Sequence, residues 1–172
     1  MNIFDFKEPE KEKIKTEKDF QEFIKKRIEN ILKRDNFEFI IIENFGLDLA
    51  IFIQKNSKVL VKFLELKVYK STSGRIGFGN QRGQGIQVEI LKLDRNKLRL
   101  LEPYVRWLFI DLEEFKDSLK RFAIIDSVIA KECVYEEVRE GKQNNFNINK
   151  IKNYATGWYN FLEKIVDFML KI

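Results

Sequence analysis

Apolar residues recur three and four positions apart between Thr16 and Asn36, which is the spacing of one face of an α-helix. They are Phe20, Phe23, Ile24, Ile28, Ile31 and Leu32. Thr16 followed by Asp19 resembles an N-terminal cap, so the segment predicts one amphipathic helix that ends near Asp35. The first fifteen residues are dominated by charge and predict a solvated, flexible lead-in.

Three short segments rich in β-branched and aromatic residues follow the helix. Residues 37–42 are apolar apart from Glu38, residues 47–54 are apolar on both faces apart from Asp48 and the final Gln54, and residues 59–69 alternate imperfectly. These patterns predict three strands of a sheet that is covered on both sides. Residues 71–85 hold five of the eight glycines of the chain and predict a mobile loop.

The second half of the chain predicts helices around one further strand. The expected elements are a helix that starts between Gln84 and Gln87 and reaches 91–93, a strand over 105–112, and helices over 113–122, 128–140 and 148–172. The order of elements predicts a single α/β domain over residues 1–172, with a mixed central sheet covered by helices and extra helices at its C-terminal end.

The amino-acid composition limits the kinds of catalytic site that the chain can form. The 172 residues suit one domain, and the net charge of +5 is compatible with a polyanionic partner without being specific for one. The chain has no His and one Cys, which excludes Ser-His and Cys-His catalytic pairs, His-based zinc sites and an internal disulfide. Carboxylates, lysines and a hard metal ion such as Mg²⁺ remain as the means of catalysis. The N-terminal residues lack the pattern of a secretory signal and no apolar run approaches the ~20 residues of a membrane span, so we expect a cytoplasmic protein without a membrane partner.

The most informative segment is the predicted hairpin over residues 47–69. If Asn56 and Ser57 form a two-residue turn, paired residue numbers sum to 113 and Asp48 lies opposite Glu65. A four-residue turn preserves this pairing, whereas a three-residue turn shifts it by one. Because side chains alternate between the two faces of a strand, Lys67 points to the same face as Glu65.

Two carboxylates that face each other in an apolar strand pair repel, and loss of water disfavours both charges. A single lysine neutralises only part of this charge. A bound divalent cation would remove the repulsion, so the pair predicts a metal site with a lysine beside it. The alternative is an edge hairpin with solvated charges, in which Lys67 forms an ordinary ion pair with Glu65 or Asp48.

The pattern Gly46-x-Asp48, followed after sixteen residues by Glu65-Leu66-Lys67, resembles the PD-(D/E)XK nuclease superfamily. The resemblance covers roughly residues 16–112 and implies a restriction-endonuclease-like core of three layers. It implies that Asp48, Glu65 and the Leu66 carbonyl bind Mg²⁺, which Mn²⁺ can replace, and that Lys67 positions the attacking water. Leu47 stands where the superfamily often has Pro.

The resemblance leaves two further positions open. Many members carry a glutamine on the helix after the motif strand, for which Gln84 or Gln87 would stand, with Gln87 placed among the catalytic residues. Some members add an acid on the first helix. Glu22 and Glu29 project opposite the apolar stripe and Glu17 falls nearer to it, so the sequence does not decide whether one of them joins the site.

We expect from these features a Mg²⁺-dependent DNA endonuclease, with a restriction-type enzyme as first choice and a junction resolvase or repair nuclease behind it. Double-strand cleavage by one small active site per chain would require a homodimer. Arg75, Arg82 and Gln84 are the expected nucleic-acid contacts, and Arg106 would contact phosphate or pair with a buried carboxylate. The alternatives are a nucleic-acid-binding protein without catalysis on the same fold, and a Mg²⁺ enzyme that acts on a smaller phosphate ester.

Overall fold

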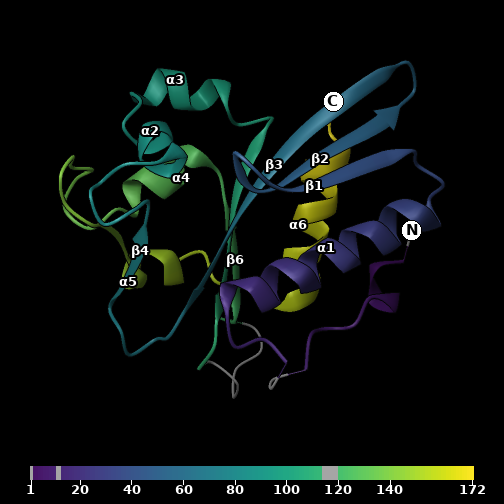
Figure 1. Ribbon diagram of the computed structural model, residues 1–172. Coiled ribbons are helices and arrows are strands. Elements are labelled where there is room, and N and C mark those ends of the chain that lie inside the picture. Colours follow the sequence, from purple (N-terminus) through teal and green to yellow (C-terminus); the bar gives the residue numbers. More distant parts are fainter. Residues whose placement is uncertain (1, 11–12, 114–119) are drawn as a thin grey trace.

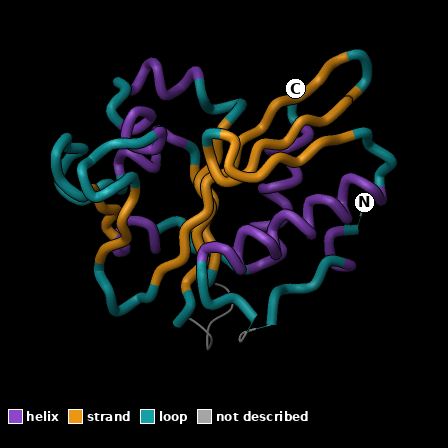
Figure 2. Tube along the Cα trace, viewed as in Figure 1, coloured by secondary structure: helices purple, strands orange, loops and turns teal. Residues whose placement is uncertain are grey.

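The computed structural model describes residues 2–10, 13–113 and 120–172, and it contains a five-stranded sheet with helices on both faces (Figures 1 and 2). The elements are η1 (Ile3–Asp5), α1 (Glu17–Arg34), β1 (Phe39–Phe45), β2 (Leu47–Lys55), β3 (Lys58–Tyr69), β4 (Arg75–Phe78), α2 (Ile86–Leu91), α3 (Arg95–Leu100), β5 (Val105–Asp111), β6 (Phe122–Ile125), α4 (Ser127–Glu132), β7 (Asn144–Asn147), α5 (Ile148–Lys152) and α6 (Trp158–Leu170). The strand order is β1-β2-β3-β5-β6, and only the β3–β5 pair is parallel. The predicted α/β class with a mixed sheet between helices is confirmed.

Each face of the sheet has its own hydrophobic core. The apolar sides of α1 and α6 pack on one face, around Phe20, Ile28, Leu64 and Phe161. The short helices α2–α5 pack on the other face with the β4–β7 ribbon, around Val88, Trp107, Phe109, Phe146 and Ile151. Successive residues of β3 therefore enter different cores, as expected for a strand covered on both sides.

The first helix follows the prediction closely. Asp19 N donates a hydrogen bond to Thr16 Oγ1, and Thr16 N donates one to the Asp19 carboxylate, which completes a capping box. The lead-in is not purely solvated, because Phe6 and Ile14 are buried and Trp158 Nε1 donates to the Phe6 carbonyl at 2.7 Å. No helix in the described ranges is long and apolar enough to cross a membrane.

Residues 71–85 were predicted to form a loop, and this prediction is wrong for the middle of the segment. Strand β4 lies there and pairs with β7, from a segment about seventy residues later in the chain. Ile76 and Phe78 are buried, and the Phe78 ring lies 4.6 Å from the Phe146 ring. The buried residues Ile76 and Phe78 alternate with other residues as in a strand, but the glycines around them made this pattern hard to recognise. The strand is stabilised by its pairing with β7, which a local sequence pattern does not reveal.

Three predicted C-terminal helices are also corrected. Residues 114–119 of the expected helix over 113–122 lie outside the described residues, and Phe122 begins strand β6. The helix over 128–140 stops at Glu132, since Val134 bridges to Phe146 instead. The helix over 148–172 is two helices, α5 and α6, because Thr156 adopts an extended bridge to Phe122 between them.

The loop before α2 approaches this helix so closely at one position that only glycine fits there. Gly79 has φ of +69°, and a Cβ atom there would lie 2.4 Å from Val88 Cγ2 and 2.9 Å from the Gln84 carbonyl oxygen. Gly74 has a similar φ of +74° but nothing within 4 Å of its Cβ position. The two glycines therefore share a backbone requirement and differ in the space around them.

We predict that Gly79→Ala lowers the free energy of unfolding by about 1–3 kcal/mol more than Gly74→Ala, since both variants strain a left-handed residue and only the first overfills the contact with α2. Urea unfolding of both variants beside the wild type measures this difference. Equal losses in the two variants would show that the loop does not press on α2 as described.

Candidate metal and nucleic-acid site

The predicted register of the β2–β3 hairpin is confirmed. Lys55 pairs with Lys58 across the Asn56-Ser57 turn, and the ladder continues with the same sum of 113 to the pair Leu49–Leu64. Asn56 has φ of +57°, which a residue of a tight turn requires and Asn tolerates. The next positions in this register are Asp48 and Glu65.

At Asp48 side chains take over the hydrogen bonds between the two strands. Leu66 N donates to Asp48 Oδ2 at 2.8 Å, and Asp48 N donates to Glu65 Oε2 at 3.3 Å. Each carboxylate thus binds the other strand's backbone, so the two acidic groups are held beside each other at the point where the regular ladder ends.

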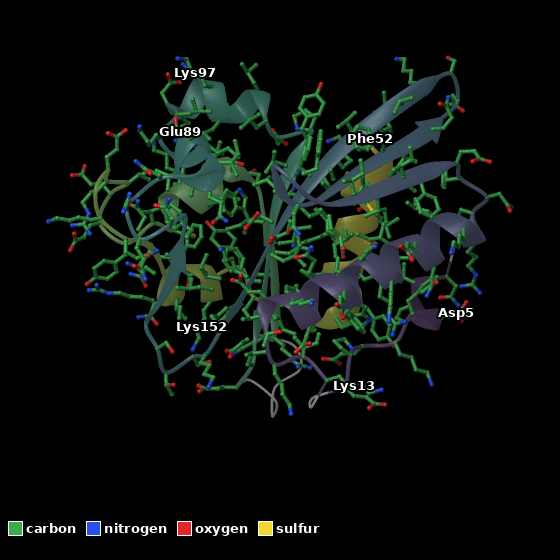
Figure 3. The ribbon with its side chains drawn as sticks, viewed as in Figure 1. Asp5, Lys13, Phe52, Glu89, Lys97 and Lys152 are labelled. Carbon is green, nitrogen blue, oxygen red and sulfur yellow. The ribbon has the colours of Figure 1, made fainter. Side chains whose placement is uncertain are left out.

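Lys67 lies on the same side of β3 and completes the predicted trio. Its Nζ atom is 3.7 Å from Glu65 Oε1 and 3.7 Å from Glu17 Oε1. The side chains of Glu65 and Lys67 are 4% and 7% exposed, whereas charged residues such as Lys13, Glu89 and Lys97 lie at the periphery (Figure 3). The alternative from sequence, an edge hairpin with solvated charges, is wrong about the edge and the solvation, whereas the ion pair of Lys67 with Glu65 that it expected is present.

The electrostatics of the trio are unbalanced. Burial, and after it the charge of Asp48, raise the pKa of Glu65 from its ordinary value of 4.5 to about 8, while Lys67 acts in the opposite direction. Burial also raises the pKa of Glu17, with Asp48 adding to the rise and Lys67 opposing it. Lys67 therefore does not fully compensate the acidic groups around it, and the site favours an additional positive charge.

Gln87 of α2 contacts the acidic pair directly. Its Nε2 atom donates to Glu65 Oε1 at 2.6 Å, and its Oε1 atom accepts the Gly79 N–H at 3.2 Å. The Gly79 bond fixes which end of the amide faces Glu65. The other candidate glutamine, Gln84, is exposed, and its backbone N–H binds the Asn80 side chain.

The first helix supplies two further contacts. Glu17 reaches Lys67, and Gln21, one turn later on the same face, donates from Nε2 to the Asp48 carbonyl oxygen at 3.1 Å. Glu22 is exposed and Glu29 lies two turns further along the helix. The structure thus brings Glu17 to the site, and Gln21 was missed because its spacing of four from Glu17 is a weak signal in so polar a sequence.

The predicted nucleic-acid contacts Arg75, Arg82 and Gln84 do not converge on the trio. Within the described part of the chain, none of the three forms a hydrogen bond or ion pair with Asp48, Glu65 or Lys67. Arg75 stacks over Tyr135, with its guanidinium carbon 3.9 Å from the ring centroid, and Arg82 is exposed in the turn before α2. Their contact with nucleic acid stays a prediction.

The donor set fits a hard divalent cation. Asp48 and Glu65 offer carboxylate oxygens, and the Leu66 carbonyl leaves β3 on the same side as its N–H, which faces Asp48. Among the residues that the structure describes, no group of three or more His, Cys, Asp or Glu side chains forms a metal cluster, so a backbone oxygen and water would complete the coordination. The Asp48 and Glu65 carboxylates, held side by side, are the observation that favours such a cation.

Comparison with known protein families, with curated proteins and with solved structures finds no match for this chain.

The raised pKa of Glu65 predicts a pH-dependent stability in EDTA. The folded protein keeps this proton up to about pH 8, while the unfolded chain releases it near the ordinary value of 4.5. The contribution of Glu65 is therefore neutral below pH 4.5 and destabilises progressively between pH 4.5 and 8. We expect the unfolding free energy of wild type minus that of Glu65→Gln to fall across this range in urea titrations. A difference that stays constant with pH would contradict the assignment.

Proposed function

We propose that the chain is a Mg²⁺-dependent phosphodiesterase that cleaves DNA. The single observation that carries the proposal is the pairing of half-buried Asp48 with buried Glu65, with buried Lys67 beside it, held by the β2–β3 register. The resemblance of Glu65-Leu66-Lys67 and Asp48 to the PD-(D/E)XK pattern, together with the sheet covered by helices on both faces, supports a restriction-endonuclease-like fold.

Asp48, Glu65 and the Leu66 carbonyl would hold Mg²⁺, or Mn²⁺ in its place. Bound there, the cation would polarise a phosphoryl oxygen and favour ionisation of water. Glu65 is kept in position by Gln87, and Asp48 by the Leu66 N–H, so the acidic pair needs little rearrangement to bind a cation.

Lys67 has two roles open to it in this arrangement. Its ammonium group lies between Glu65 and Glu17, so it can orient an attacking water molecule and stabilise the negative charge that develops on phosphate. Glu17 anchors the ammonium from the helix side. We therefore place Glu17 and Gln21 in the site as positioning residues.

Within the nuclease class, restriction-type cleavage is the first choice, with a junction resolvase or repair nuclease behind it. Cleavage of both strands would require two copies of the chain as a homodimer. A nucleic-acid-binding protein without catalysis is the rival from another class, and it is favoured if DNA affinity survives removal of the acids while no cleavage is detected.

The cleavage prediction uses plasmid and branched DNA with Mg²⁺ or Mn²⁺. We expect Asp48→Ala, Glu65→Ala and Lys67→Ala each to lower the rate at least about 100-fold, because each removes a group from the reacting centre. Lys142→Ala, from the exposed Glu140-Gly141-Lys142 copy of the motif, is the matched control and should cleave like the wild type. Equal activity of all five proteins would refute the site.

The metal prediction needs no substrate. At pH 8, Mg²⁺ or Mn²⁺ should raise the melting temperature of the wild type, because a cation that binds only the folded protein stabilises it. The shift should vanish in Asp48→Asn and Glu65→Gln and persist in Glu22→Gln, an exposed acid on the same helix as Glu17. A full shift in the first two variants would place the cation elsewhere.

A further inference from the structure

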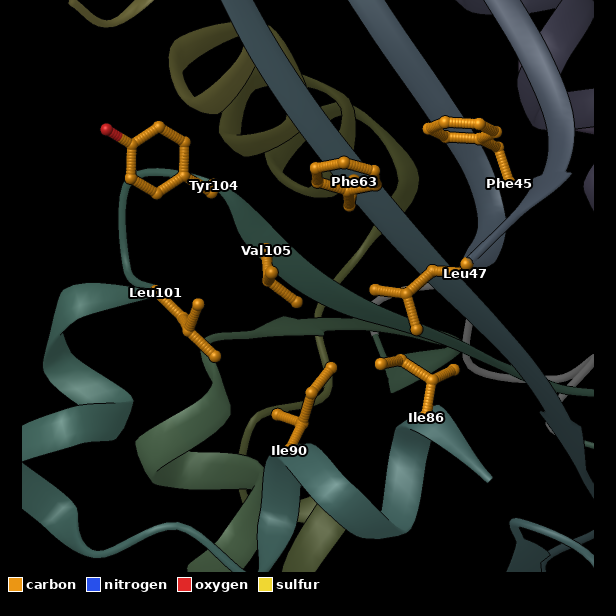
Figure 4. Close-up of a pocket in the computed structure, with 9 residues that line it drawn as sticks. Phe45, Leu47, Phe63, Ile86, Ile90, Leu101, Tyr104 and Val105 are labelled. Carbon is orange, nitrogen blue, oxygen red and sulfur yellow. The ribbon is translucent and has the colours of Figure 1, made fainter. Parts of the chain in front are cut away.

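An apolar pocket of about 550 Å³ opens beside the candidate metal site. In Figure 4 the rings of Phe45, Phe63 and Tyr104 lie along one side of the pocket, and Ile86 and Ile90 of α2 lie on the opposite side. Phe45, Ile86 and Tyr104 are 55%, 48% and 49% exposed, which is unusual for large apolar side chains gathered in one place.

On three elements, a residue that lines the pocket lies one or two positions from a residue of the acidic site. Leu47 lines the pocket and Asp48 follows it on β2, and Ile86 lines the pocket and Gln87 follows it on α2. On β3, Phe63 lines the pocket and Glu65 follows on the same face of the strand. A phosphate at the acidic site therefore has its own nucleotide, or the neighbouring one, within reach of the aromatic rings.

The lining selects for a flat apolar group. No charged side chain lines the pocket, so it offers nothing to a free phosphate or to an acidic peptide. Aromatic rings that face a pocket stack on nucleobases without regard to base identity. In a duplex the faces of each base are covered by its neighbours, so only an unpaired base can present its face to these rings.

A basic pocket lies on the other face of the sheet, and the segment 101–106 separates it from the apolar pocket. The segment 101–106 contributes Tyr104 to the apolar pocket and Arg106 to the second pocket. Three further cations and one acid also line the second pocket: Lys62, Arg99, Lys171 and Glu102. Lys62 is 3% exposed, and its ammonium donates to the carbonyls of Pro103 and Lys171 without a carboxylate among these partners. Stacking rings beside clustered cations are the combination with which proteins hold single-stranded nucleic acid.

Resting on the proposed function, we propose that the apolar pocket binds an unpaired base next to the phosphate at the Asp48–Glu65 site, so that the substrate is single-stranded DNA or DNA with unpaired nucleotides. The basic pocket, beyond the segment 101–106, takes a phosphate farther along the same strand, which passes over this end of the sheet. A second copy of the chain is a poorer occupant, because a symmetric contact would place the two pockets opposite each other. Neither copy would then insert a side chain into the pocket of the other.

The test measures binding in EDTA, so that it does not depend on cleavage. Fluorescence anisotropy gives the Kd of a labelled oligothymidine and of a blunt duplex of equal length, for the wild type and for Phe45→Ala with Tyr104→Ala. We expect this double variant to weaken single-strand binding roughly 10- to 100-fold and to leave duplex binding within about twofold. Phe4→Ala with Tyr154→Ala, which removes the same two residue types from exposed positions outside the pocket, should change neither.

Two further variants test the opposite wall of the pocket and the basic pocket separately. Ile86→Asn changes the opposite wall and should weaken single-strand binding in the same direction, so the result does not depend on the folding of one variant. Arg99→Ala should lower the slope of log Kd against log salt by about 0.7 for a single strand. An unchanged slope removes the basic pocket from the proposal.

The outcomes separate this inference from the proposed function. Single-strand affinity within twofold of the wild type in both pocket variants overturns the inference, even if the wild type cleaves DNA. Pocket-dependent single-strand binding by a wild type that cleaves nothing supports the inference and refutes the nuclease. Loss of a wild-type dimer in the double variant, seen by light scattering with unchanged DNA affinity, would assign the pocket to a second copy instead.

Discussion

The hydrogen bond from Leu66 N to Asp48 Oδ2 fixes the candidate site. At the end of the β2–β3 ladder a side chain accepts the N–H, and the same carboxylate is thereby held beside Glu65. A shift of one residue in the hairpin would turn Asp48 into the opposite core and separate the two acids. The position of the chemistry is thus decided by the turn at Asn56-Ser57, some eight residues away along each strand.

The cost of this arrangement explains its surroundings. Two carboxylates held side by side with little access to water destabilise the fold unless nearby groups neutralise their charge or donate hydrogen bonds to them. Lys67 supplies one positive charge, which it shares between Glu65 and Glu17 of α1, and Gln87 donates a hydrogen bond to Glu65. Gln21 of α1 binds the Asp48 backbone and leaves the carboxylates unchanged. The pKa of Glu65 nevertheless lies near 8, because burial and the charge of Asp48 favour its protonated form. A cation bound between the two carboxylates would favour the ionised form instead.

The sequence could predict what depends on local periodicity and on short turns. The amphipathic pattern of α1 and the hairpin register follow from rules within about twenty residues, and so does the convergence of Asp48, Glu65 and Lys67. The β4–β7 ribbon could not be predicted, because Ile76 and Phe78 find their partner near Phe146 across the fold. The choice of Glu17 over Glu22 and Glu29 likewise depends on how α1 meets β3, whereas Gln87, already expected among the catalytic residues, does contact Glu65. The aromatic pocket joins residues from four separate segments, so no local pattern reveals it.

The most direct measurement is an anomalous difference map from crystals of the wild type soaked in Mn²⁺ at pH 8. The proposed site predicts one peak bounded by the Asp48 and Glu65 carboxylates and the Leu66 carbonyl oxygen. It also predicts that the peak disappears in Asp48→Asn crystals of the same form. Density for Mn²⁺ only at other positions, with the acidic pair bound to Lys67 and Gln87 alone, would contradict the claim that this pair is a metal site.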